Sequence, residues 1–88
     1  MLFMVVFDYE PEDRETVVNR RKEIGQTKVP GMKTLGEWSY LGGGKVFELV
    51  ECDNPRSMLG ASSAWADLGK LEIFPVMETE ELMKLLPK

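Results

Sequence analysis

The first strand of this chain is the feature that most limits the fold. Residues 2–9 read LFMVVFDY, and both alternating sets of side chains are apolar. One set is Phe3, Val5 and Phe7, and the other is Leu2, Met4 and Val6. Successive side chains of a strand point to opposite faces of the sheet, so this strand is expected to be covered on both faces.

The next segments predict a helix and then a hairpin. Acidic residues crowd the start of residues 12–24 and basic residues the end, as the helix dipole favours, and Gly25 is a stop signal. Residues 33–41 and 45–51 then read as two strands. They are joined over the glycines 42–44, because glycine adopts the positive φ of a tight reversal without steric cost.

The last third of the chain predicts helix, strand and helix. Asp53 or Asn54 can cap the second helix, whose apolar residues recur on one face. A fourth strand is expected over residues 70–77, where Pro75 indicates an edge position or a bulge. Thr79 is expected to cap a short C-terminal helix.

The resulting order is βαββαβ plus a short helix. Right-handed crossovers turn this order into a ferredoxin-like α+β fold: one four-stranded antiparallel sheet with two helices on one face. We expect a single domain over residues 1–88, since a chain of this length supports one core. The helix-free face needs a cover, and the same face of a second copy is the simplest one, which predicts a homodimer.

Composition removes several classes of function. The formal charge of −4 opposes binding to nucleic acid and to anionic lipid surfaces. The apolar N-terminal run has no basic flank and is too short to span a bilayer, so we read it as a buried strand and expect no membrane partner. The chain has no histidine and one cysteine, Cys52, which excludes an intramolecular disulfide and favours the cytoplasm. We expect neither a metal site nor a cofactor.

Two motifs invite other interpretations. The run LGGGKV resembles a phosphate loop, but Ser39 and Val46 stand where that motif needs glycine and a hydroxyl residue, so a hairpin explains it better. An RNA-recognition fold shares the order of elements, and Phe3 and Phe47 could be its stacking residues. The surrounding glutamates would oppose phosphate, which argues against RNA.

Carboxylates on the strands are the most informative candidates for a site. Placing the more apolar alternating sets under the helices sends Glu48 and Glu72 to the helix-free face. Glu37, in phase with Ser39, joins them if Trp38 packs beneath a helix. Acids in a closed, partly apolar space would have raised pKa values and could hold a proton, a cation or a polar ligand group. Solvated acids or charge pairs across the dimer are the alternative.

Both tryptophans are expected in the core, although Trp38, on an outer strand, could also wall a pocket. Trp65 lies on the apolar stripe of its helix. Cys52 has no histidine to activate it and is interpreted as a passive residue.

Several short segments occur in a characteristic order: the opening MLFMVV, Pro30-Gly31, Glu37-Trp38, Glu51, Trp65-x-Asp67 and EIFPV at 72–76. Together, in this order and spacing, they resemble the DUF3303 family of the dimeric α/β-barrel superfamily. The resemblance implies a homodimer whose two sheets enclose a barrel or sandwich. Many relatives carry histidine where this chain has Ser39, which places chemistry that uses that histidine in question.

The resemblance alone does not settle the activity, because the superfamily includes cofactor-independent monooxygenases, isomerases and ligand-binding proteins. Our leading hypothesis is a homodimer that binds a small molecule between its sheets, and we assign no catalytic residue. A cofactor-independent enzyme with a cavity glutamate as acid or base is one alternative. A regulatory or scaffold dimer without a pocket is the other. The candidate ligand-binding residues are Glu37, Trp38, Ser39, Glu48 and Glu72.

Overall fold

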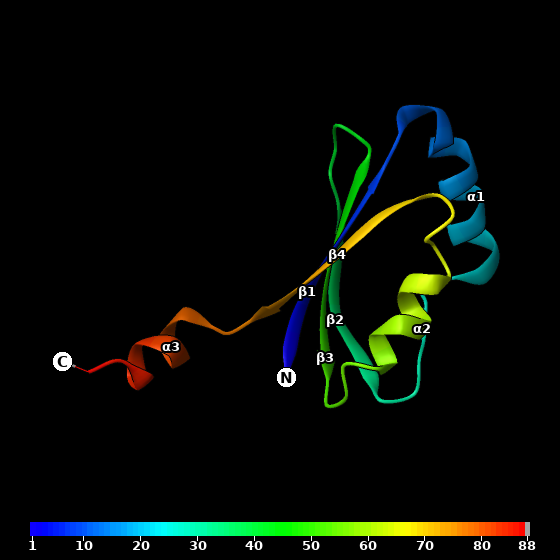
Figure 1. The fold of residues 1–88 in the computed structure, drawn as a ribbon. Coiled ribbons are helices and arrows are strands. Elements are labelled where there is room, and N and C mark those ends of the chain that lie inside the picture. Colours follow the sequence, from blue (N-terminus) through cyan, green and yellow to red (C-terminus); the bar gives the residue numbers. More distant parts are fainter. Residues whose placement is uncertain (88) are drawn as a thin grey trace.

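The computed structural model describes residues 1–87 and confirms the ferredoxin-like fold. Four antiparallel strands form one sheet in the order β2-β3-β1-β4. Helices α1 and α2 cover one face of this sheet (Figure 1). The elements are β1 (Leu2–Tyr9), the 3-10 helix η1 (Pro11–Asp13), α1 (Arg14–Ile24), β2 (Met32–Ser39), β3 (Lys45–Cys52), α2 (Ser57–Ser63), β4 (Gly69–Val76) and α3 (Thr79–Leu85).

Strand β1 lies in the middle of the sheet and sets the position of its neighbours. Phe3 is opposite Val50 of β3 on one side and Pro75 of β4 on the other. Phe3, Val50, Cys52 and Met58 form one buried cluster between the sheet and α2. The first alternating set of β1 therefore faces the helices, as an apolar central strand requires.

Arg20 joins the two helical segments on that face. Its guanidinium donates two hydrogen bonds to the Asp67 carboxylate, at 2.7 and 2.8 Å, and one to the Ala64 carbonyl oxygen at 3.0 Å. The same group lies 5.6 Å from the ring centre of Trp65. A bidentate charged pair holds a defined geometry, so α1 is tied to the turn that follows α2.

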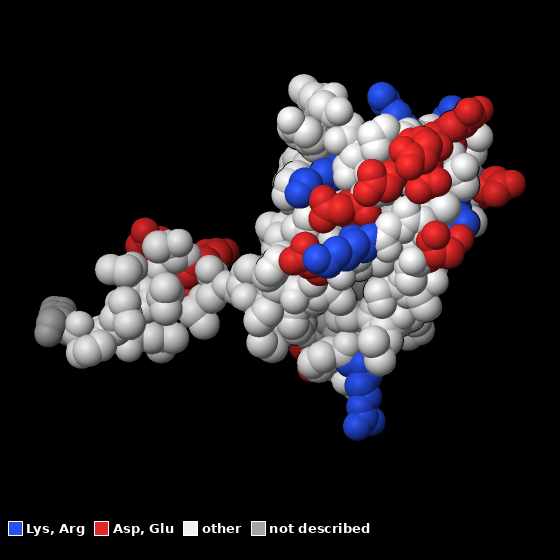
Figure 2. Space-filling model, turned by 45° about the horizontal axis from the view of Figure 1, so that its top comes forward, with Lys and Arg blue, Asp and Glu red and all other residues white. Residues whose placement is uncertain are grey.

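The chain enters α1 through an acidic segment. Glu12 and Asp13 lie in η1 and Glu15 in the first turn of α1, where the helix dipole favours negative charge. Figure 2 shows Asp and Glu side chains gathered over the upper part of the body, with Lys and Arg side chains around them. Gly25 ends the helix with a φ of 69°, a conformation that glycine adopts without strain.

A β-bulge interrupts the pairing of β2 with β3. Thr34 pairs with Val50 and Gly36 with the adjacent Leu49, so Leu35 is the extra residue. A bulge changes which side chains share a face. Beyond it, Glu37 pairs with Glu48, so that Thr34 and Glu37, which would alternate in a regular strand, both face the helices.

The opposite face of the sheet carries large apolar side chains that no element within residues 1–87 covers. Trp38 is 56% exposed, Phe74 45% and Leu35 45%. Met4 and Leu49 lie side by side in the middle of this face. Trp38 is therefore not part of the core of a single chain, contrary to the expectation from its sequence position.

Helix α3 stands away from the body of the molecule, beyond the end of β4 (Figure 1). Its apolar side chains are exposed; they are Leu82, Met83, Leu85 and, just after the helix, Leu86. Such a segment buries little of its own surface and, on its own, is too short to be a stable helix in water.

The predicted caps are only partly present. Helix α2 starts at Ser57, and Asn54 accepts a hydrogen bond from the Arg56 amide at 3.0 Å in the turn before it. Thr79 is the first residue of α3 rather than its cap, and Glu78 occupies the cap position without a side-chain bond. Pro75 lies in the edge strand β4, as its missing amide predicted.

Cys52 is buried, and its thiol donates a hydrogen bond to the Asn54 carbonyl oxygen at 2.9 Å. Within residues 1–87, no helix combines the length and hydrophobicity needed to cross a membrane.

Two glycines test the packing, because replacement by alanine should destabilise the protein at one of them and stabilise it at the other. A Cβ on Gly69 would clash with the Asp8 carbonyl oxygen and lie 2.8 Å from a Phe7 ring carbon, so Gly69→Ala should lower the free energy of unfolding by about 1–3 kcal/mol. A Cβ on Gly60, in α2, meets Val29 at 3.5 Å, an ordinary contact. Gly60→Ala should therefore stabilise the protein by up to about 1 kcal/mol.

Urea unfolding of the two variants and the wild type measures both effects. Equal effects of the two substitutions would contradict the close approach of β4 to β1 at this point.

Candidate functional site

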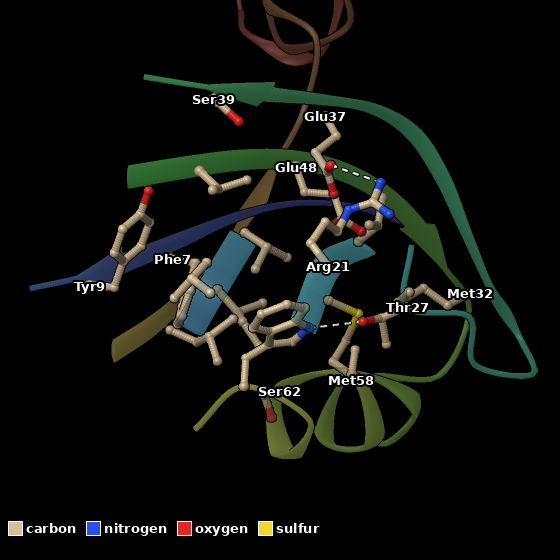
Figure 3. A pocket seen from close by; sticks show the side chains of 18 of the residues that line it. Phe7, Tyr9, Arg21, Thr27, Met32, Glu37, Ser39, Glu48, Met58 and Ser62 are labelled. Carbon is tan, nitrogen blue, oxygen red and sulfur yellow. Dashed lines mark hydrogen bonds and ion pairs between the residues drawn. The ribbon is translucent and has the colours of Figure 1, made fainter. Parts of the chain in front are cut away.

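A cavity with a volume of about 240 Å³ lies between the sheet and the two helices that cover it. Its walls are mostly apolar: Val5, Phe7 and Val50 line it from the sheet, and Met58 and Trp65 from α2 and the following turn. Figure 3 shows side chains from β1, β2, β3, α1 and α2 converging on this space. The cavity is therefore within one chain, on the side of the sheet that carries the helices.

Polar side chains line the cavity from the strands and from the helices. Glu37 and Ser39 come from β2, Glu48 from β3 and Arg21 from α1. Glu37 and Glu48 are direct cross-strand partners, so their carboxyl groups meet on the same face. Figure 3 shows Arg21 reaching toward both of them.

Each carboxyl group has a different partner. Arg21 Nη2 lies 3.2 Å from Glu37 Oε1 and forms an ion pair with it. The Thr34 hydroxyl donates a hydrogen bond to Glu48 Oε1 at 3.0 Å. The side chains of Arg21 and Glu37 are 41% and 25% exposed, so this pair lies at the border between the cavity and solvent.

The pKa of Glu48 is raised above that of a free glutamate. Burial is the largest cause, because a low-dielectric surrounding disfavours the ionised form, and the neighbouring Glu37 adds repulsion and a carboxyl–carboxyl hydrogen bond. The hydrogen bond from Thr34 and the charge of Arg21 act in the opposite direction without cancelling the shift. Glu48 thus keeps a proton to a higher pH than an exposed glutamate does.

Aromatic residues line another part of the cavity, from β1 and from the turn after α2. The Trp65 indole Nε1 donates a hydrogen bond to the Thr27 hydroxyl at 3.0 Å, and its ring lies 5.7 Å from that of Phe7. Tyr9 continues this wall at 5.6 Å from Phe7. Trp65 was expected in the core; it is partly buried, and one side of it lines the cavity.

The structure brings together three of the five sequence-predicted residues. Glu37, Ser39 and Glu48 line the cavity, whereas Trp38 and Glu72 lie on the opposite face of the sheet. Glu72 pairs in register with Val6 and lies 3.7 Å from Lys70 Nζ, with a side chain that is 41% exposed.

The expectation that Glu48 faces away from the helices is wrong. It assumed that the more apolar set of β3, with Phe47 and Leu49, packs beneath the helices. The register places Val50 opposite Phe3 in the core, and Glu48, two residues earlier, shares that face. The larger apolar side chains of β3 lie on the helix-free face instead.

Sequence reasoning did not select Arg21 or Thr34. Arg21 follows Val17 by four residues, a spacing that puts both on one side of α1, and Val17 is buried. That signal could have indicated an arginine over the sheet. Thr34 reaches Glu48 only because of the bulge at Leu35, for which the sequence carries no clear signal.

Among the residues that the structure describes, no group of three or more His, Cys, Asp or Glu side chains is arranged to hold a metal ion.

The raised pKa of Glu48 predicts a pH dependence of stability. The folded protein binds this proton more tightly than the unfolded chain does. The glutamate therefore lowers stability progressively as the pH rises above 4.5, the ordinary pKa of a glutamate, until Glu48 is ionised in the folded state as well. Glu48→Gln should therefore raise the melting temperature at neutral pH, and the difference should shrink toward the acid side. Glu10→Gln, at an exposed position without a side-chain cap bond, is the control.

Differential scanning calorimetry across this pH range measures the effect. A Glu48→Gln difference that stays constant with pH would contradict a proton held more tightly in the folded state.

The comparison with known proteins agrees with the fold. The profile of a domain of unknown function, DUF3303, matches residues 1–88. No curated protein matches the chain. A crystal structure from Deinococcus radiodurans, described as a proposed antibiotic biosynthesis monooxygenase, superposes with a TM-score of 0.51 at 15% identity. The match covers 88% of this chain and 92% of that one, and at this identity it shows a shared fold alone.

Because the family profile spans the whole sequence, the chain belongs to the DUF3303 family, with the ferredoxin-like fold that the strand order shows.

Proposed function

We propose that this protein is a homodimer that binds a small molecule in the cavity between the sheet and helices of each copy. The observation that carries the proposal is an apolar cavity of about 240 Å³ with a few polar groups on one side. Binding sites for small molecules typically combine apolar walls with a small number of convergent polar groups. A cavity of about 150 Å³ is enough for benzene, so a ligand with one substituted ring or a short chain is the expected size.

The polar side of the cavity would orient the ligand. Glu37, Glu48 and Ser39 present oxygen atoms to it, and Arg21 closes the border to solvent through its ion pair with Glu37. Trp38 and Glu72 cannot contact a ligand there, because they lie on the other face of the sheet. They belong to the surface that a second copy would cover.

The homodimer is supported by the exposed apolar face. Trp38, Leu35 and Phe74 are exposed on one side of a thin sheet, and an uncovered patch of this kind is typical of an interface. Helix α3 adds further exposed leucines beyond β4, where it can reach a second copy. Two copies facing each other through their sheets would cover both.

A cofactor-independent enzyme is the second candidate function, and the raised pKa of Glu48 favours it. A carboxyl group that titrates nearer to neutral pH is suited to act as a general acid or base. Glu48 would be the proton-transferring group, with Thr34 and Glu37 setting its proton affinity. If the wild-type protein converts a bound compound chemically and Glu48→Gln does not, that result would support an enzyme over a binding protein.

The two tryptophans provide a direct test of where a ligand binds. Trp65 lines the cavity and Trp38 lies on the opposite face, so each indole N–H reports on one side of the sheet. We expect benzyl alcohol to shift the indole signal of Trp65 in a ¹H–¹⁵N correlation spectrum and to leave that of Trp38 unchanged. Trp38→Phe assigns the two signals.

A shift confined to Trp38 would place the ligand between the sheets of two copies instead. No shift of either indole by any small aromatic probe would favour a dimer that serves only as a scaffold.

The dimer has its own test. Light scattering at micromolar concentration should give twice the mass of one chain. Trp38→Glu should shift the protein toward the monomer, because it places a charge in the apolar face. Leu41→Glu adds the same charge at a fully exposed position in the turn between β2 and β3 and should have no effect. A monomeric wild type would contradict the proposed assembly.

A further inference from the structure

We propose that the cavity selects a small apolar molecule with a protonated amine, whose cationic group binds the Glu48 carboxyl group beside Glu37. This inference rests on the proposed function and names the chemical class of its ligand. It is carried by the position of the two carboxyl groups at the side of an otherwise apolar cavity and by the partners that each of them has.

Of the two carboxyl groups at the cavity, Glu37 already has a cationic partner within residues 1–87 and Glu48 does not. Arg21 is paired with Glu37 at 3.2 Å. Glu48 takes part in none of the ion pairs that the described residues form, and the hydroxyl of Thr34 is its hydrogen-bond donor. Ionised Glu48 thus lacks a cation of its own, while its remaining oxygen lone pairs are available to a donor in the cavity.

The charges at the cavity affect anionic and cationic ligands differently. A carboxylate in this position would face Glu37 and Glu48 and could gain a cation only by separating Arg21 from Glu37. Lys22 also lines the cavity, but it is exposed on α1, where water screens its charge. A protonated amine meets two carboxyl groups. Of the two cations that line the cavity, Arg21 is already paired with Glu37 and Lys22 is exposed to solvent, so the local charge favours the amine over an anion.

Binding of a cation at Glu48 is coupled to protonation of this carboxyl group. The groups that face Glu48 are Glu37 and Thr34 of β2 and Arg21 of α1, with Tyr9 on the same wall as Phe7. Two neighbouring carboxyl groups disfavour double ionisation, and a proton on one of them relieves the repulsion. An ammonium group gives the same relief and adds hydrogen bonds, so at a pH where Glu48 is protonated its binding should release that proton to solvent.

The apolar walls supply the rest of the binding. Val5, Val50 and Phe7 from the sheet and Trp65 and Met58 from the helical side surround the body of the ligand. Burial of one ring removes apolar surface from water, which favours binding for neutral and cationic ligands alike. Selectivity should therefore come from the polar side of the cavity.

Three probes of nearly equal shape and different charge test the proposal: benzylamine, benzyl alcohol and benzoate. Titration of the dimer, followed by the Trp65 indole signal, should give the tightest binding for benzylamine and the weakest for benzoate. Glu48→Gln should weaken benzylamine about ten-fold, since hydrogen bonds to charged groups are the stronger ones, and change benzyl alcohol less than about two-fold. Glu72→Gln, on the other face of the sheet, should change neither.

The pH dependence separates the two ways in which Glu48 could bind a ligand. An ammonium needs ionised Glu48, so benzylamine should bind more tightly at about pH 8 than at about pH 5, with protons released on binding at the lower pH. A neutral acceptor would need protonated Glu48 and show the opposite trend. Benzyl alcohol should show little change.

The outcomes distinguish this inference from the proposed function. If benzyl alcohol binds at Trp65 as tightly as benzylamine, or if benzylamine binds better at low pH, the amine selectivity is wrong and the cavity remains a binding site. If no probe shifts Trp65, the cavity is not a binding site, and both proposals fail. If Glu48→Gln is poorly folded, Thr34→Val serves instead: it removes the hydroxyl that stabilises ionised Glu48 and should weaken benzylamine alone.

Discussion

The pairing of β1 with β3 is the constraint on which the rest of the molecule depends. Phe3 and Val50 oppose each other and are buried, so the two central strands have one register. A slip of one residue would turn every side chain of β3 to the other face. Once Val50 lies in the core, Glu48 must lie beneath the helices opposite Val5. The polar side of the cavity is thus a direct consequence of how the core is closed.

The order of elements and the sheet could be predicted from the sequence, because they depend on strong local signals. Strand β1 is apolar on both faces, which predicts a covered central strand. Three glycines between β2 and β3 predict a tight turn, and a proline in β4 predicts an edge strand. The faces could not be predicted in the same way. Strand β3 alternates Val46, Glu48 and Val50 with Phe47, Leu49 and Glu51, so each face carries two apolar residues and one acid. Alternation alone does not say which set lies inside.

The β-bulge in β2 explains why only part of the site could be predicted from the sequence. Glu37 and Ser39 were expected together, since they are two residues apart, and they do share a face. Thr34 is an odd number of residues away from Glu37 and joins them through the bulge at Leu35. The hydroxyl that stabilises ionised Glu48 therefore depends on a backbone feature rather than on a residue pattern.

The sizes of the side chains connect the cavity with the exposed face. Beneath the helices, the middle of the site carries the small residues Val5 and Val46 from the sheet and Ala61 from α2, and their limited volume leaves the space that the cavity occupies. On the other face of the sheet, the large side chains of Trp38 and Phe47 lie opposite each other on β2 and β3. If the larger set packed under the helices, it would fill the cavity and leave a less apolar outer face. The same alternation of small and large side chains thus produces both the internal cavity and the external apolar surface. Substitutions that exchange the two sets between the faces would therefore alter the cavity and the outer surface together.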